Sequence, residues 1–363
     1  MSNFNFEQTK SALAAYTSIG NIHSADGYGS GHINGTFKVV SDKGIYILQR
    51  INDYVFKDPR GVMNNICAVG EHLRKKAAAS GGDVERCTLN VVLTDSGESL
   101  VETENGFWRM YEFVRDSVSY DLANSIEDFK SSARAFGNFQ RLLADFPAET
   151  LCEPIKDFHN TPVRYENFLA ALKANKSGRA DNAAAEIAFV KERADFARVL
   201  QEAHERGELP LRVTHNDTKL NNILFDKNTG EALCVIDLDT IGPGFSVTDF
   251  GDAIRFGANT AAEDEKDVSK VSLDLELFKA YAEGFIEGCD GRLEEDEIKL
   301  LPEGAMMMTF ECGMRFLTDY LDGDVYFHTD YPEHNLVRCR TQFALLADME
   351  RKKAQMDAIC ARK

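Results

Sequence analysis

The first hundred residues alternate short apolar runs with turn residues. The runs begin with FKVV and IYILQRI on either side of the turn SDKG, and continue with TLNVVLT, SLVET and FWRMYEFV around DSGE and NG. Short apolar runs bounded by Gly, Asp, Asn and Ser are typical of antiparallel strands joined by tight turns. Between them, residues 62–79 favour one helix, which Ser80, Gly81 and Gly82 would end. The N-terminal part is therefore predicted to be a small antiparallel sheet with one helix.

After Tyr111 the apolar pattern changes to helical periods. Ser125 followed by Asp128 is a capping-box start. Apolar residues then recur at helical spacing, namely Ile126, Phe129, Ala133, Phe136, Phe139 and Leu143. Further helices are predicted at about 183–206, 273–287, 303–322 and 335–360. Only 211–239 interrupts this half with strand-like runs, LRVTH, NILFD and ALCVIDLD, the last preceded by the turn KNTG.

These patterns predict an α+β protein of two lobes. The chain has no internal repeat and no low-complexity linker, so the boundary is placed at a short hinge at residues 111–116. Residues 1–110 would form the small sheet lobe, and residues 117–363 the larger, mainly helical C-terminal lobe. The apolar share of 44% and the charged share of 28% fit a folded globular chain of this length.

The charge and the cysteines of the chain limit the kinds of partner and the compartment that we expect. The 41 Lys and Arg residues face 59 Asp and Glu residues, a net charge of -18 that disfavours nucleic acid as a partner. A ligand carrying phosphates would need a metal ion or local basic groups to offset this field. The start MSNFNFEQTK shows no export signal, no apolar run is long enough for a membrane span, and the eight cysteines are scattered. A cytoplasmic protein with reduced thiols is expected.

The candidate chemistry lies in the string THNDTKLNNILFDKNTGEALCVIDLD. Asp217 follows the strand-like LRVTH, Asn222 comes five residues later, and Asp237 ends the strand-like CVID. A carboxylate can take the proton of an acceptor hydroxyl, and carboxylate and amide oxygens suit Mg²⁺. Asp and Asn between strands also serve as plain turn formers, which is the better interpretation of an isolated HND. The complete string with its flanking strands favours a functional site.

This order resembles the catalytic loop and metal aspartate of protein-kinase-like phosphotransferases. HND is similar to the small-molecule branch that includes aminoglycoside and choline kinases. The resemblance implies ATP as phosphoryl donor, Asp217 as catalytic base, and Asn222 and Asp237 as Mg²⁺ ligands. The tripeptide DFG at Asp249 lies too far along the chain for the metal role and is interpreted as a helix cap or a brace for the catalytic loop. Asp239 would share a strand face with Asp237, which leaves it open as a second ligand.

The N-terminal lobe offers candidates for nucleotide binding. Gly29 and Gly31 lie in GYGSGHINGTFKVV, where glycines let backbone N–H groups approach phosphates. Hairpin glycines are also ordinary turn formers. The strand Lys of the kinase pattern is missing, since IYILQRI offers Gln49 and Arg50 instead. Only one of these two can face the cleft, and an Arg50 pair with Glu71 is one possibility. Glu112 at the hinge is a further candidate for nucleotide binding.

A closer resemblance extends over nearly the whole chain. The segments YGSGHIN, RYENF, LRVTHNDTKLNNIL, IDLDT, DFGDAIRFGA, ECGMRFLTDYL and YPEHNLVR are similar to bacterial N-acetylhexosamine 1-kinases. These enzymes phosphorylate the anomeric hydroxyl of N-acetylglucosamine and N-acetylgalactosamine. The resemblance implies that the sugar is bound by Asp217, His32, Arg315 and Tyr326.

The residues themselves leave alternatives open. Glu311, Arg315 and Asp319 are spaced four apart, which also fits a run of ion pairs within one helix, and Tyr326 could be an aromatic plug for the lobe. The apolar stripe of that helix is expected to be core. Other acceptors within the fold are choline, homoserine or an aminoglycoside, and a non-catalytic nucleotide-binding module is the alternative of another class. The oligomeric state and the preference among sugars stay open.

Overall fold

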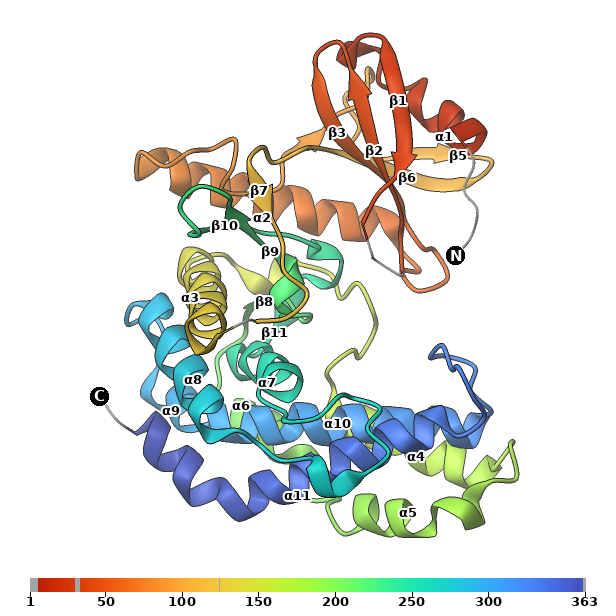
Figure 1. Cartoon of the computed structure of the whole chain (residues 1–363), viewed down its shortest axis with the longest axis vertical. Helices are drawn as coiled ribbons and strands as arrows, with labels where there is room; N and C mark the ends of the chain where they lie inside the picture. The colour runs from red at the N-terminus through yellow and green to blue at the C-terminus, as the bar shows by residue number, and fades with distance from the viewer. Residues whose placement is uncertain (1–5, 30–32, 124, 362–363) are drawn as a thin grey trace. The chain divides into compact units, whose positions relative to one another are not determined.

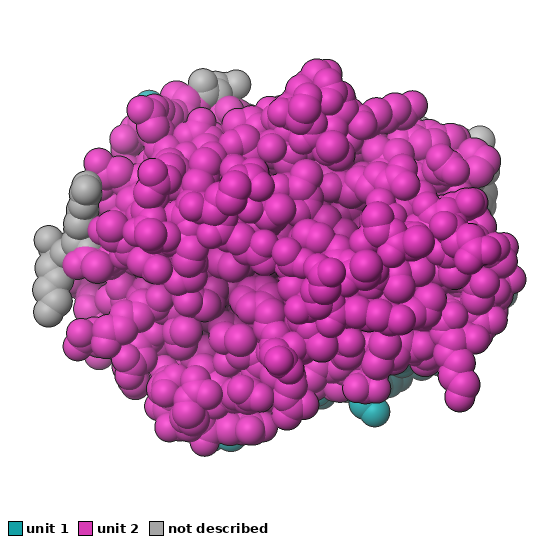
Figure 2. Space-filling model, turned by 90° about the horizontal axis from the view of Figure 1, so that it is seen from below, with its two compact units in different colours: residues 1–118, 149–156, 224–242 teal, residues 119–148, 157–223, 243–363 magenta. Residues whose placement is uncertain are grey.

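The computed structural model describes residues 6–29, 33–123 and 125–361. The chain divides into two compact units, which Figure 2 colours teal and magenta. Unit 1 comprises residues 1–118, 149–156 and 224–242, and unit 2 comprises 119–148, 157–223 and 243–363. Each unit is described by itself. The hinge at 111–116 and the lobe bounds given above stay predictions.

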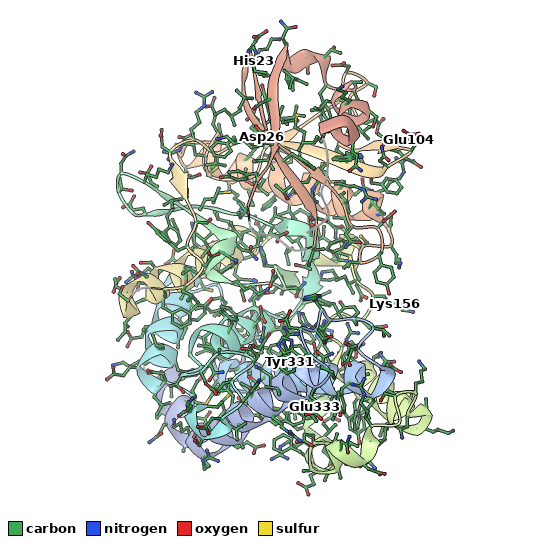
Figure 3. The ribbon with its side chains drawn as sticks, turned by 45° about the vertical axis from the view of Figure 1, so that its right-hand side comes forward. His23, Asp26, Glu104, Lys156, Tyr331 and Glu333 are labelled. Atoms are coloured by element: carbon green, nitrogen blue, oxygen red, sulfur yellow. The ribbon has the colours of Figure 1, made fainter. Side chains whose placement is uncertain are left out.

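An antiparallel sheet forms the centre of unit 1 (Figure 1). Its path runs β1 (Ile22–Gly27), β2 (Gly35–Ser41), β3 (Gly44–Arg50), β6 (Gly106–Glu112) and β4 (Val91–Val92), and β5 (Val101–Thr103) also pairs with β6. The register places Phe37 opposite Leu48 and Gln49 opposite Arg109. The predicted antiparallel sheet is confirmed. Strand β1, which the apolar pattern did not predict, carries His23 (Figure 3). Its Nε2 lies 2.8 Å from Oδ1 of Asp42.

The two faces of this sheet carry different helices. On one face, apolar side chains of the strands pack with α1 (Phe6–Leu13) and with residues of the 3-10 turn η1 (Thr17–Ile19). This core contains Ala12, Leu13, Tyr16, Ile19, Ala25, Phe37, Val39, Leu48, Trp108 and Met110. Helix α1 is too short to give a clear apolar period, and the sequence did not predict it. Helix α2 (Pro59–Ala79) carries Met63, whose sulfur lies 3.9 Å from Arg109 on the other face.

Helix α2 begins three residues before its predicted start. Asp58 is the N-cap and accepts a hydrogen bond from the Gly61 N–H, while Pro59 occupies the first turn, where its missing N–H costs nothing. The helix ends at the predicted Ser80, the C-cap. Its buried Asn65 donates to the carbonyls of Cys152 and Ile241 and accepts from the Cys152 N–H. This one amide therefore fastens all three chain segments of unit 1 together.

A second, three-stranded sheet has the order β10 (Ala232–Val235), β9 (Ile223–Asp226), β7 (Ser117–Val118). The turn between β9 and β10 is the predicted KNTG, in which Asp226 accepts from the N–H groups of Asn228 and Thr229. Arg86 also pairs with Asp226 at 2.7 Å. Strand β10 is followed by the 3-10 turn η6 (Leu238–Thr240).

Helices make up most of the described part of unit 2. They are α3 (Ile126–Leu142), α4 (Thr161–Ala174), α5 (Ala184–Lys191), α6 (Val199–Glu205), α7 (Ser246–Gly257), α8 (Leu275–Cys289), α9 (Glu295–Lys299), α10 (Leu301–Asp322) and α11 (His334–Cys360). Strand β8 (Arg212–Thr214) pairs with β11 (Gly242–Gly244). The Ser125 hydroxyl accepts from the Asp128 N–H, as the predicted cap requires. The α+β fold class predicted from the sequence is confirmed.

One predicted helix is wrong in its extent. The segment predicted as a single helix at 183–206 is α5, a turn, the 3-10 turn η4 (Phe196–Arg198) and α6. Arg193 stacks on Phe189 and pairs with Glu350 at 2.8 Å, and the Phe196 ring meets Phe310 at 5.8 Å. Packing on α10 and α11 therefore breaks a segment whose local pattern favours continuation.

The long helix α10 is the centre of unit 2 and lies beside α11 (Figure 1). Its predicted apolar stripe is confirmed as core, since Met307, Phe310, Met314, Leu317 and Leu321 are all buried. Within the described residues, no helix is long and apolar enough to cross a membrane. All eight cysteines are free thiols, as expected.

Candidate active site

The loop after β8 holds Asp217 in a fixed backbone conformation. Its N–H donates to Nδ1 of His215 at 3.2 Å. The His215 ring is buried and packs edge-on against Phe136 and Phe139, with centroid distances of 5.5 and 6.1 Å. Asn216 between them has a φ of 65°, in the left-handed region that Asn tolerates better than most residues. The HND motif is therefore a structural turn whose His orients the following Asp.

The Asp217 carboxylate has two polar partners. Nζ of Lys219 lies 2.6 Å from Oδ1, and Nδ2 of Asn222 donates to Oδ2 at 3.0 Å and to the Asp217 carbonyl at 2.8 Å. Asn222 closes the 3-10 turn η5 (Leu220–Asn222), which folds it back toward Asp217. Burial alone would lower the pKa of Lys219, but Asp217 and Asp252 raise it, so the side chain stays cationic. The structure thus brings Asp217 and Asn222 together as the sequence predicted.

Asp249 of the DFG tripeptide braces this loop. Its carboxylate accepts from the backbone N–H groups of His215 at 2.9 Å and Asn216 at 2.8 Å, and from Nε2 of Gln140 at 2.8 Å. Burial raises the pKa of Asp249 above its usual value, although these donors act in the opposite direction. Of the two predicted roles the brace is confirmed. The cap is wrong, because Phe245 is the N-cap of α7.

Asp252, one turn further along α7, holds the next residue of the loop. It accepts from the Thr218 N–H at 3.2 Å and pairs with Arg255 at 2.9 Å. Helix α7 therefore binds three backbone N–H groups of the loop around Asp217, those of His215, Asn216 and Thr218, through two carboxylates.

The carboxylates after β10 differ from the prediction. Strand β10 ends at Val235, and Asp237 has a φ of 57°, so Asp239 lies on the turn η6 and not on a shared strand face. The Asp239 side chain is buried, forms an ion pair with Arg109 and accepts from Nδ2 of Asn34. Asp239 is therefore held within unit 1 by Arg109 and Asn34, and the same-face argument for a second ligand is wrong.

Arg109 is the buried cation that sequence reasoning missed. Its Nε and one terminal nitrogen donate to Oε1 of Gln49 at 3.0 and 2.8 Å, and its guanidinium lies 5.2 Å from the Tyr111 ring centroid. Burial lowers the pKa of Arg109, but Asp239 outweighs this effect and raises it overall. Its only sequence signal is a charged residue inside the apolar run FWRMYEFV. Arg109 and Gln49 thus occupy the sheet face where a strand Lys was expected.

The other candidates for nucleotide binding, Arg50 and Glu112, have separate surroundings within unit 1. Nε of Arg50 donates to the Asn105 carbonyl, while Glu71 pairs with Arg74 at 3.0 Å and Lys75 at 3.4 Å on its own helix. These contacts take the place of the Arg50–Glu71 pair considered from the sequence. Glu112 is exposed at the end of β6, opposite Tyr46.

The predicted glycine hairpin joins β1 and β2. Gly29 has a φ of 80° and open space around a hypothetical Cβ. A positive φ is the conformation that favours glycine over other residues. Gly31 and His32 lie outside the described residues.

Arg315 has an aromatic environment instead of the predicted ion pairs. Its guanidinium carbon lies 5.1 Å from the ring centroid of Phe158, 5.8 Å from Tyr326 and 5.5 Å from Phe327. Glu311 instead contacts His159 and Thr161, and Asp319 accepts the N–H groups of residues 325–327. The run of intrahelical ion pairs considered from the sequence is therefore replaced by longer-range contacts. Tyr326 is 52% exposed, which contradicts the alternative role of a core plug.

A second Arg adjoins this aromatic cluster of Arg315, Phe158, Tyr326 and Phe327. Arg164 on α4 donates twice to the Phe158 carbonyl, at 3.0 and 3.1 Å. Burial and the nearby charge of Arg315 lower the pKa of Arg164 from its usual value. Two guanidinium groups therefore share one neighbourhood, which disfavours a positively charged ligand there.

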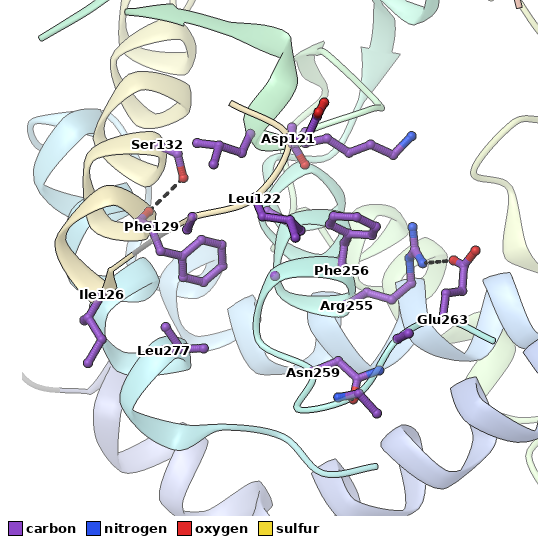
Figure 4. Close-up of a pocket in the computed structure, with 18 of the residues that line it drawn as sticks. Asp121, Leu122, Ile126, Phe129, Ser132, Arg255, Phe256, Asn259, Glu263 and Leu277 are labelled. Carbon is purple, nitrogen blue, oxygen red and sulfur yellow. Dashed lines mark hydrogen bonds and ion pairs between the residues drawn. The ribbon is translucent and has the colours of Figure 1, made fainter. Parts of the chain in front are cut away.

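A cavity of about 670 Å³ lies beside the loop that follows Asp217 (Figure 4). Thr218, Lys219 and Leu220 contribute to its wall, with apolar side chains of α3 and α7 around them. Arg255 faces it but is paired with Asp252 and Glu263. Neither Arg315 nor Tyr326 lines this cavity. The aromatic cluster and the cavity are thus separate features of unit 2.

A model of the phosphotransferase enzyme family, abbreviated APH, matches residues 25–283. The chain belongs to this family. It is accordingly a phosphotransferase by family. The match covers the glycine hairpin, the HND loop and α7, but not α10.

Solved structures of the same fold cover almost the whole chain. A microcompartment-associated aminopropanol kinase has a TM-score of 0.61 at 17% identity, over 97% of this chain and 99% of its own. A spectinomycin phosphotransferase in complex with ADP and spectinomycin has a TM-score of 0.56 at 13% identity, over 96% and 98%. A choline kinase from Cryptosporidium parvum has a TM-score of 0.55 at 15% identity, over 97% of both chains. At these identities the likeness shows the fold.

The donor atoms near Asp217 are compatible with a hard cation. Both hydrogen bonds that Asn222 makes to Asp217 use its Nδ2, so they leave the amide oxygen for a ligand role. An amide oxygen is one of the oxygen donors that Mg²⁺ prefers. No group of three or more His, Cys, Asp and Glu side chains suited to a metal ion occurs in the part of the chain that is described.

Proposed function

We propose that the protein transfers the γ-phosphoryl group of ATP to the anomeric hydroxyl of an N-acetylhexosamine, with N-acetylglucosamine and N-acetylgalactosamine as acceptors. Family membership supports the reaction class, and the resemblance of the sequence segments to N-acetylhexosamine 1-kinases supports the sugar. The observation that carries the acceptor class is the aromatic cluster around Arg315. A half-exposed ring and a fixed donor suit a neutral hydroxylated ligand.

In this proposal Asp217 orients the acceptor hydroxyl and accepts its proton. In phosphoryl transfer the protein mainly positions the reacting groups and neutralises the negative charge of the phosphates. Lys219 pairs with the Asp217 carboxylate at 2.6 Å and orients it. Asn222 and Asp237 would hold Mg²⁺, which when bound neutralises charge on the phosphates. Gly29, Gly31, Gln49, Arg50 and Glu112 are proposed for the nucleotide, and His32, Arg315 and Tyr326 for the sugar.

A cationic acceptor is the second candidate, because the net charge of -18 attracts amines such as choline or an aminoglycoside. Near the proposed acceptor site, however, the local charge is positive, in contrast to the net charge of the chain. Arg164 and Arg315 lie close enough for the charge of one to lower the pKa of the other. An ammonium group placed beside them would be repelled, so the local field favours the sugar.

The test is an acceptor panel with ATP and Mg²⁺, in which product formation is followed by phosphorus NMR and acid lability. We expect an acid-labile sugar 1-phosphate from N-acetylglucosamine or N-acetylgalactosamine, and little product from choline, homoserine or an aminoglycoside. A sugar 6-phosphate, or a phosphorylated amine alone, would show the acceptor assignment to be wrong. ATP consumption that does not depend on any acceptor would favour a different activity.

A variant of Arg315 tests the site itself. Arg315→Met keeps a long apolar side chain among the rings but removes the donors, so the KM for the sugar should rise about tenfold, the value of one lost hydrogen bond to a charged group. The KM for ATP should change less than about twofold. The matched control is Arg338→Met, because Arg338 also stacks on an aromatic ring, at 5.5 Å from Phe316. Equal effects of both variants would contradict the assignment.

A further inference from the structure

His159 lies between a buried carboxylate and the catalytic loop. Its Nδ1 is 2.8 Å from Oε1 of Glu311, and its Nε2 is 3.4 Å from the carbonyl oxygen of Asn216. The His159 side chain is 11% exposed and that of Glu311 is fully buried. The other Glu311 oxygen accepts from the Thr161 hydroxyl at 2.6 Å. The ring therefore connects α10 to the peptide that precedes Asp217.

Both ring nitrogens of His159 face hydrogen-bond acceptors. Burial would raise the pKa of Glu311, but the neighbouring His159, Arg315 and Thr161 together outweigh it and lower the pKa, so the carboxylate is ionised and only accepts. A carbonyl oxygen likewise only accepts. A ring that donates to both acceptors carries a proton on each nitrogen, and the contact with Glu311 fixes the plane of the ring, which directs Nε2 at the Asn216 carbonyl.

The Asn216 peptide needs such support. Its φ of 65° lies in the left-handed region, which costs about 1 kcal/mol for a residue with a side chain. Asp249 already binds its N–H at 2.8 Å. His159 contacts the carbonyl of the same residue, so Asn216 is held on both sides, and the orientation of the next residue, Asp217, follows from it.

A second path of contacts reaches His159 from the acceptor side. Its ring lies 4.3 Å from the Phe158 ring, and the Arg315 guanidinium is 5.1 Å from that same ring. Arg315 follows Glu311 by one turn of α10. The group that orients His159 and the proposed sugar-binding Arg are thus parts of one helix face.

We propose that His159 is a positioning residue for the catalytic base, holding the Asn216 carbonyl so that Asp217 points at the acceptor hydroxyl. The inference rests on the proposed function of Asp217 as base, but not on which alcohol is the acceptor. Loss of this contact leaves nucleotide binding intact and lowers the rate of the chemical step, because a small displacement of a reacting group is costly.

Two substitutions separate this role from mere support of Glu311. His159→Gln places an amide donor near the position of Nε2, toward Asn216, whereas His159→Asn places one near Nδ1, toward Glu311. We expect kcat to fall about 30-fold or more in H159N but less than about fivefold in H159Q, with the KM for ATP within about twofold in both. Equal losses, a more active H159N, or a loss seen only in KM would overturn the proposal.

Folding controls accompany the kinetics. Thermal melting of both variants identifies loss of structure, and Thr161→Val removes another partner of Glu311 without touching the ring. We expect T161V to keep kcat within about twofold. If H159N does not fold, the kcat of H159Q alone tests the proposal. A kcat within about fivefold of that of the original chain supports the donor role of His159. A loss of kcat above about 30-fold overturns it.

Failure of this inference can be told from failure of the sugar assignment. The acceptor panel with the unsubstituted protein decides the acceptor first, and the His159 variants are then compared on whichever alcohol is phosphorylated. If no alcohol is accepted, hydrolysis of ATP by water serves as the reaction. The order H159Q above H159N is expected in each case, and its reversal overturns the positioning role whatever the acceptor.

Discussion

At the scale of single residues, the Asp217 carboxylate is held by residues close to it in the sequence. The loop that carries Asp217 is held by a residue far from it in the sequence. His215, Lys219 and Asn222, all within five residues of Asp217, bind its N–H and its carboxylate. Asp249 binds the loop backbone from 34 positions away. The near contacts position the carboxylate, and the distant one keeps the left-handed turn from relaxing.

Asp217→Asn tests the base. The amide keeps the size of the side chain but cannot accept the proton, and it loses the charge that pairs with Lys219. We expect kcat to fall by about 10³-fold with the KM for the sugar within about threefold, as measured by coupled assay of ADP release. Glu104→Gln, an exposed change in unit 1 (Figure 3), is the control. Turnover near that of the control would contradict the assignment.

At the scale of elements, close helix packing depends on glycine. Helices α3 and α8 approach so closely that a Cβ on Gly137 would lie 2.3 Å from the Phe285 carbonyl oxygen, and one on Gly288 would lie 2.4 Å from that of Arg134. Backbone atoms cannot move aside as a flexible side chain can. These glycines therefore set the spacing of the helix pair that carries Phe136, Phe139 and Gln140 to the catalytic loop.

Gly284→Ala tests this packing. Its Cβ would lie 2.5 Å from the Lys130 carbonyl oxygen and 3.0 Å from Cβ of Ala133. Overpacking of this kind should lower the free energy of unfolding by about 3 kcal/mol, despite the better helix propensity of Ala, as measured by urea denaturation. Gly27→Ala, where nothing lies within 4 Å of the new atom, should change it by less than about 1 kcal/mol. Similar values for both would show that the helices can separate freely.

At the scale of the whole molecule, the charge balance makes stability depend on buried, hydrogen-bonded carboxylates. The chain carries 59 acidic residues against 41 basic ones, so partnerless carboxylates would repel one another. Asp348 on α11 accepts from the Leu273 N–H and the Ser272 hydroxyl, both at 2.8 Å, and pairs with Lys352 at 2.7 Å. It thereby joins α11 to the segment that leads into α8.

We expect Asp348 to account for part of the loss of folding stability at low pH. Burial would raise its pKa, but Lys352, Leu273 and Ser272 lower it from 3.8 to about 2. The folded chain thus keeps Asp348 ionised where the unfolded chain protonates it, so its contribution of about 2 kcal/mol is present above pH 4 and is lost as the pH falls from 4 to 2. Urea unfolding of Asp348→Asn should show this deficit at pH 6, with the difference from the original chain shrinking toward pH 2.

Exposed Asp181 provides the comparison for this measurement. Asp181→Asn should change the free energy of unfolding by less than about 0.5 kcal/mol at every pH. A deficit of D348N that stays constant between pH 6 and pH 2 would show that shape rather than charge accounts for it.

The sequence by itself determined whatever depends on neighbours along the chain. The strand and helix periods, the Ser125 cap, and the spacing of Asp217, Asn222 and Asp237 are local, and the family followed from them. The tertiary structure alone decided the contacts of Arg109, His159 and Asp239, and the break after α5. Asp239 faces Arg109 across 130 residues and Glu311 faces His159 across 152. A buried polar group takes whichever partner the packing of apolar faces brings to it, and hydrophobic periodicity specifies that a face is buried but not against which residue.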